Sequence, residues 1–143
     1  MTVPREILAG GIMVVAICAA IGVAIPMTAF AQSMNAAGNP CAGSGSTVDT
    51  VACFAKAYEE EDHRLNQLYA RIQKVLVADE KAALVKAERL WVQYRDATCD
   101  AERTLYGSGT GGYPTKVACL AAEARARHDS LLRSYGWVLE KRG

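Results

Sequence analysis

Five cysteines constrain this chain more than any other feature of its sequence. Cys18 lies in an apolar N-terminal segment, and Cys41, Cys53, Cys99 and Cys119 follow it. An even number of cysteines in a small domain is typical of exported proteins, in which disulfides add stability that a modest core cannot supply. We therefore expect an exported domain that is held by two disulfides.

The N-terminal segment has the pattern of a secretory signal peptide. Arg5 precedes an uncharged apolar stretch over residues 7–25, Pro26 interrupts it, and Ala29-Phe30-Ala31 fits the small-x-small cleavage rule. We predict a signal peptide over residues 1–31, cleavage following Ala31, and a periplasmic or secreted bacterial protein. An uncleaved leader would instead anchor the chain in a membrane, because its apolar run is long enough to span a bilayer.

The net charge limits the partners that the chain can attract, and the length of residues 32–143 limits the number of domains. The formal net charge is +1, so nothing indicates bulk attraction to nucleic acid or to anionic lipid. Residues 32–46 are small, polar and glycine-rich, and they predict an irregular N-terminal arm. Residues 47–143 are long enough for one domain.

Hydrophobic periodicity predicts three helices. Over residues 48–77, apolar side chains recur every seven residues in three columns, interrupted once, at Glu61 and Asp62. The columns are Val51, Tyr58, Leu65 and Ile72; Phe54, Glu61, Leu68 and Val75; and Ala55, Asp62, Tyr69 and Leu76. Thr47 is a plausible N-cap.

A second helix is expected over residues 81–105, with a buried face marked by Leu84, Ala87, Trp91 and Tyr94. The glycine-rich segment 106–114 must be a loop. A third helix is expected to begin near Pro114 and to end or bend at Gly136. The fold class is therefore all-α, an antiparallel three-helix bundle with two disulfides, preceded by a signal peptide.

Helices joined by a tight turn mirror each other about that turn, which we place at residue 79. Asp62 then lies level with residue 96, and we expect it to form an ion pair with Arg95. The same mirror places Cys53 about 9 Å along the axis from Cys99, farther than a disulfide allows. Of the three possible connectivities, this geometry favours the local pairs Cys41–Cys53 and Cys99–Cys119.

Three groups of residues form spaced motifs over about residues 41–132. They are Tyr58, Asp62, Leu65, Asn66 and Tyr69, then Trp91, Arg95, Asp96 and Cys99, then Gly111, Gly112, Cys119 and Arg127. Together these motifs resemble the LprI-like lysozyme inhibitor family of bacterial envelope proteins. The resemblance implies a small, helical, exported protein and an inhibitor of lysozyme. Glu88, Tyr113 and Ala124 stand where the family often has Gln, Ser and Thr, and these departures bear on inhibitory specificity.

The loop between the second and third helices is the candidate binding site. A glycosidase cleft holds a pair of carboxylates, and a protruding loop with hydroxyl and backbone N–H groups could hydrogen-bond there. The candidate residues are Ser108, Gly109, Thr110, Gly111, Gly112 and Tyr113. The alternative is that the segment is only a flexible connector closed by the disulfide.

Catalysis has little support in the sequence. His63 and His128 are the only histidines, and no motif couples either to a nucleophile or a metal. We expect no enzyme activity, no cofactor and no metal site. The expected partner is a lysozyme; the alternative is an envelope adaptor or structural module that binds another envelope protein or a wall component.

Overall fold

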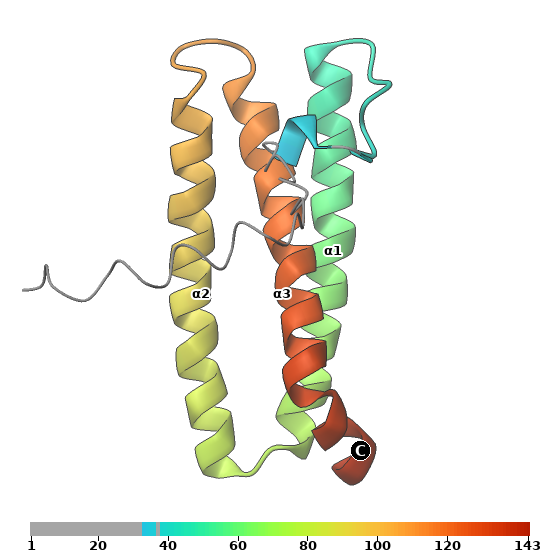
Figure 1. Ribbon diagram of the computed structural model, residues 1–143, viewed down its shortest axis with the longest axis vertical. Coiled ribbons are helices and arrows are strands. Elements are labelled where there is room, and N and C mark those ends of the chain that lie inside the picture. Colours follow the sequence, from blue (N-terminus) through green and yellow to red (C-terminus); the bar gives the residue numbers. More distant parts are fainter. Residues whose placement is uncertain (1–32, 37) are drawn as a thin grey trace, which may run out of the picture.

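The computed structural model describes residues 33–36 and 38–143. It contains a short 3-10 helix, η2 (Ser33–Asn35), and three long helices, α1 (Thr47–Val75), α2 (Ala78–Thr104) and α3 (Gly112–Arg142). α1 and α3 run in the same direction and α2 runs antiparallel to both, so the expected all-α three-helix bundle is confirmed (Figure 1). The predicted signal peptide and its cleavage site lie outside the described residues.

α3 is the central helix of the bundle. It packs along the whole of α1 and against α2, whereas α1 and α2 hardly approach each other (Figure 1). The expectation that α1 and α2 face each other as a mirrored hairpin is therefore wrong. The reason is the distribution of apolar surface, since α3 buries ten residues and α2 buries only two. α3 therefore offers α1 the larger surface to pack against.

The apolar columns of α1 form one side of the core, as predicted. Every residue in the three columns is buried or half-buried. The main cluster combines these columns with Leu84 of α2 and with Ala124, Leu131 and Val138 of α3. A smaller cluster joins Phe54 of α1 to the N-terminal half of α3 and to the arm.

The helix ends differ by a few residues from those expected. Ser46, rather than Thr47, is the N-cap of α1, and its hydroxyl accepts a hydrogen bond from the Asp49 N–H at 3.2 Å. α3 begins at Gly112, which places Pro114 within its first turn, where no intrahelical acceptor is available for an N–H. α3 also continues past Gly136 to Arg142.

The predicted buried face of α2 is only partly correct. Leu84 is buried and Trp91 packs against the core, but Ala87 is exposed and Tyr94 is 58% exposed. Because α2 has a close neighbour only in α3, it buries a narrow strip, and one flank of the expected apolar face remains in solvent.

Both predicted disulfides are present. Cys41–Cys53 ties the arm to α1, with Cα atoms 5.9 Å apart, and Cys99–Cys119 ties α2 to α3, with Cα atoms 5.5 Å apart. Met34 of the arm packs into the smaller core cluster beside the first disulfide. Among the described residues, no helix is long and apolar enough to cross a membrane.

Candidate functional site

The glycine-rich loop over residues 105–111 joins α2 to α3 at one end of the bundle (Figure 1). Backbone hydrogen bonds fold it into consecutive turns: Gly107 N–H donates to the Thr104 carbonyl at 3.0 Å, and Gly109 N–H to the Tyr106 carbonyl at 2.8 Å. Gly107 has a φ of 53°, a left-handed conformation that favours glycine. The loop is thus compact and internally bonded.

Glycine is required at positions 111 and 112 for steric reasons. A Cβ atom on Gly111 would lie 2.6 Å from Cε1 of the Tyr106 ring, and one on Gly112 would lie 3.2 Å from the Arg103 carbonyl oxygen. Larger residues would push the Tyr106 ring and the end of α2 away from α3. These two glycines therefore allow the loop to close tightly.

The structure divides the six candidate loop residues. Ser108, Gly109 and Thr110 form the exposed tip, and Tyr113, in the first turn of α3, is 60% exposed. Gly112 is buried and Gly111 is half-buried, so these two support the loop and do not form its outer surface. The binding role of this set stays a prediction.

Two exposed apolar residues at the same end of the bundle were not singled out from the sequence. Leu105 at the end of α2 is 75% exposed, and Val48 in the first turn of α1 is 77% exposed. In the sequence, each is only an apolar residue in a terminal turn of a helix. Hydrophobic periodicity cannot assign such a residue to the buried or the exposed face. Together with Tyr113, they give this end a partly apolar surface.

Contacts between the helices hold the base of the loop. The disulfide Cys99–Cys119 lies below it, and Lys116 Nζ pairs with Asp100 Oδ1 at 2.5 Å beside this disulfide. The Thr115 hydroxyl donates to the Gly111 carbonyl at 2.7 Å. The loop is therefore fixed to both helices.

The other motif residues gather between the middle parts of the helices. The guanidinium groups of Arg95 and Arg127 lie 5.1 and 5.7 Å from the centroid of the Trp91 ring, within the range of cation–π interaction. Arg127 Nε also donates to Glu88 Oε1 at 2.9 Å, which joins α3 to α2. The departure at Glu88 thus supplies a charged partner for Arg127.

The predicted ion pair between Asp62 and Arg95 is not formed. Arg95 Nε donates to Asp96 at 2.9 Å, and Asp62 accepts from the Asn66 amide at 2.8 Å. The wide separation of α1 and α2 explains the difference. Burial raises the pKa of the Tyr58 hydroxyl above the usual tyrosine value, while the charge of Arg95 lowers it and the charges of Asp62 and Asp96 raise it.

The acidic interruption of the α1 stripe is paired with α3. Glu61 is buried, and its carboxylate accepts from Arg125 Nε at 2.8 Å and from Arg64 at 3.2 Å. Two guanidinium groups thus offset the cost of burying this carboxylate. With Leu65 and Tyr69 in the core cluster, most of the family motif lies in the packing between helices.

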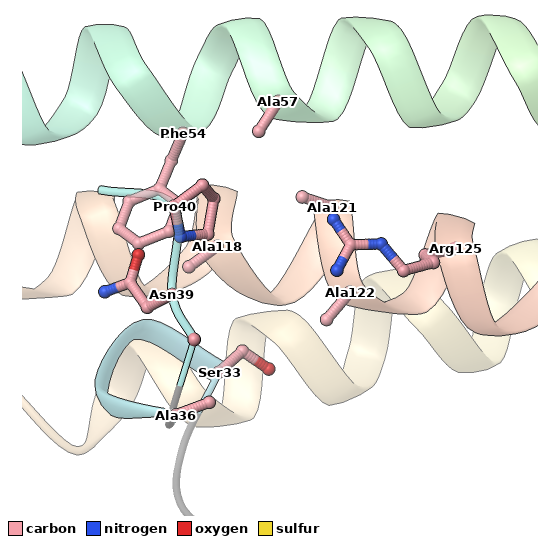
Figure 2. Close-up of a pocket in the computed structure, with 11 residues that line it drawn as sticks. Ser33, Ala36, Asn39, Pro40, Phe54, Ala57, Ala118, Ala121, Ala122 and Arg125 are labelled. Carbon is pink, nitrogen blue, oxygen red and sulfur yellow. The ribbon is translucent and has the colours of Figure 1, made fainter. Parts of the chain in front are cut away.

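A hollow of about 170 Å³ lies between the arm, α1 and α3 (Figure 2). Arg125 reaches it from α3, and alanines on α1 and α3 leave the space open. The Asn39 side chain at its edge already bonds the Met34 carbonyl and the Cys41 N–H. The volume is below the roughly 300–1,000 Å³ of usual small-molecule sites. The lining consists of Ser33, Ala36, Gly38, Asn39, Pro40, Phe54, Ala57, Ala118, Ala121, Ala122 and Arg125.

The described residues do not assemble a recognisable catalytic group. His63 lies 3.4 Å from the Gln67 amide and His128 lies 3.1 Å from Asp129. Within the described ranges, no three side chains of His, Cys, Asp or Glu come together as a metal site.

A family comparison agrees with the motifs. No curated protein and no solved structure matches the chain. The family model described as "Lysozyme inhibitor LprI" matches residues 39–131. This span covers more than half of the chain and includes all four bonded cysteines, the loop and the motif residues. The chain therefore belongs to the LprI lysozyme inhibitor family.

Proposed function

We propose that this protein is an exported lysozyme inhibitor, which binds a lysozyme and occludes its cleft without catalysing a reaction. The observation that carries the proposal is the family match over residues 39–131. Two disulfides support a site of action outside the cytoplasm, because such bonds persist in oxidising compartments.

The loop end of the bundle is the proposed inhibitory surface. The hydroxyls of Ser108, Thr110 and Tyr113 can donate hydrogen bonds to the carboxylates that a glycosidase cleft contains. The loop is bonded internally and fixed to α2 and α3, so little conformational entropy is lost when it enters a cleft. The exposed ring of Tyr113 adds apolar area to the contact.

The test measures inhibition of chicken-type lysozyme on cell-wall substrate by the exported, purified protein. We expect inhibition at micromolar protein. The double variant Ser108→Ala/Tyr113→Ala should weaken it by about tenfold or more, as truncation of an interface hot spot does. Tyr94→Ala is the matched control, because Tyr94 is as exposed as Tyr113 but lies in the middle of α2.

Two outcomes would contradict this proposal. No inhibition at micromolar concentration would exclude chicken-type lysozyme as the target. An unchanged inhibition constant for the double variant, with circular dichroism showing an intact fold, would remove the loop from the mechanism.

A further inference from the structure

α2 carries a second apolar stripe, which no other part of the described chain covers. Its residues follow one another at alternating spacings of four and three, which is the spacing of a coiled-coil seam. All six are exposed: Ala83, Ala87, Leu90, Tyr94, Ala97 and Ala101. The two large side chains at its centre, Leu90 and Tyr94, are each 58% exposed.

This stripe is separate from the face that α2 packs into the bundle. At about 100° per residue, it lies roughly 100° around the helix from the face that contains Leu84, Trp91 and Cys99. α2 also lies at the edge of the bundle, with α3 on one side only (Figure 1). Single exposed apolar residues are common on proteins, but six in strict heptad register form a continuous surface.

We propose that this stripe pairs with the same stripe of a second copy, in an antiparallel two-fold dimer. A two-fold axis level with Val92 brings Leu90 against Tyr94 of the partner subunit and Tyr94 against Leu90 of the partner subunit. The alanines on either side then face alanines, which lets the helices approach closely. In this register, every residue of the stripe lies opposite a residue of the same stripe on the second copy.

Charge complementarity selects the second copy and the antiparallel direction. Lys86 and Asp100 flank the stripe on one side, six and eight residues from Val92, and both are exposed. Antiparallel pairing brings Lys86 near Asp100 of the partner subunit, and the symmetry repeats this pair. Parallel pairing would instead place Lys86 beside Trp91 of the partner subunit and would form no such pair.

Both charged side chains are exposed beside the stripe. Lys86 forms no ion pair within the described part of the chain. Asp100 is held by Lys116 from its own α3, and its side chain remains 53% exposed. The stripe is about 27 Å long at 1.5 Å per residue. A helix pair of this length forms a small interface, so we expect a micromolar dissociation constant.

Sedimentation equilibrium of the exported protein, from micromolar to millimolar concentration, tests the proposal. The average mass should rise from that of one chain to that of two. Tyr94→Glu should leave the protein monomeric throughout, and Leu90→Lys is a second variant with the same expectation. Tyr113→Glu is the matched control, since it places the same charge on an equally exposed tyrosine at the loop end.

Exchanging the charges of Lys86 and Asp100 tests the proposed antiparallel register of the two helices. Lys86→Asp and Asp100→Lys should each weaken the dimer by about tenfold, because each places like charges together. The combined variant should recover the original dissociation constant. A merely structural role of these residues would give no recovery.

Three results would overturn the proposal: a monomer at every concentration, a dimer that persists in both Tyr94→Glu and Leu90→Lys, or a combined charge exchange without recovery. The second result would indicate another contact face, such as the exposed Trp137 on α3. Lysozyme inhibition by Tyr94→Glu should be unchanged, so the dimer and the proposed inhibitory function are tested independently.

Discussion

At the scale of single residues, Glu102 is the titratable group with the clearest consequence for stability. It is half-buried on α2, one turn from Cys99, and its Oε2 atom has no hydrogen-bond partner among the described residues. Burial raises the pKa of its carboxyl above the usual glutamate value, and the nearby Glu123 raises it further. The folded protein thus holds this proton more tightly than the unfolded chain does.

The sign of the pH dependence follows from this shift. The favourable effect of the protonated carboxyl is complete below the usual glutamate pKa and is lost as the pH rises through the raised pKa. We predict that Glu102→Gln increases the urea midpoint of unfolding at neutral pH and leaves it nearly unchanged at pH about 4. Glu123→Gln, which removes the second cause only, should give a smaller increase. A lower midpoint for Glu102→Gln at neutral pH would contradict this reading.

For the acidic residues of α1, the sequence predicts that a partner is needed but does not predict which residue it is. The interruption of the apolar stripe at Glu61 and Asp62 correctly indicated that a carboxylate in the seam needs a partner. The partner could not be identified, because it depends on which helix lies opposite. Arg125 of α3 takes this position for Glu61, whereas Arg95 of α2, the expected partner for Asp62, pairs with Asp96.

At the scale of elements, the junction of the α2–α3 loop with α3 depends on glycine for space, whereas the position of Gly136 inside α3 does not. Gly111→Ala would place a Cβ atom against the Tyr106 ring, and we predict a loss of about 1–3 kcal/mol in the free energy of unfolding. Gly136→Ala, inside α3, meets nothing nearer than 3.9 Å and should gain about 0.5–1 kcal/mol from helix propensity. Urea unfolding of the two variants measures both changes; a neutral Gly111→Ala would mean that the Tyr106 ring moves aside freely.

The elements themselves differed in how well the sequence predicted them. α1 has three apolar columns, interrupted only at Glu61 and Asp62. Its existence, bounds and buried face were predicted to within two residues. α2 has two apolar faces about 100° apart, and periodicity alone cannot tell which of them meets the core. The expected face combined Leu84 and Trp91 from one with Ala87 and Tyr94 from the other. The distinction requires the position of α3.

At the scale of the whole molecule, stability is unevenly distributed among the helices. α1 and α3 share the main core along their length, whereas α2 contributes only Leu84 and Cys99 as fully buried residues. α2 is otherwise held by the Glu88–Arg127, Asp100–Lys116 and Glu80–Arg142 ion pairs, by Trp91 and by the Cys99–Cys119 disulfide. Regions with few buried apolar contacts are the first to open locally. We therefore expect α2 to be the helix most dependent on its covalent link.

Removal of each disulfide in turn tests this uneven distribution. Cys99→Ala/Cys119→Ala and Cys41→Ala/Cys53→Ala should each cost about 3 kcal/mol, since chain entropy changes little between loops of these lengths. Their effects on hydrogen exchange should differ. The first variant should raise exchange in the C-terminal half of α2 and in the loop while α1 and α3 stay protected, and the second should raise it in the arm and the first turns of α1. A uniform rise across all three helices in the first variant would show that α2 unfolds only together with α1 and α3, and that its sparse packing is sufficient without the disulfide.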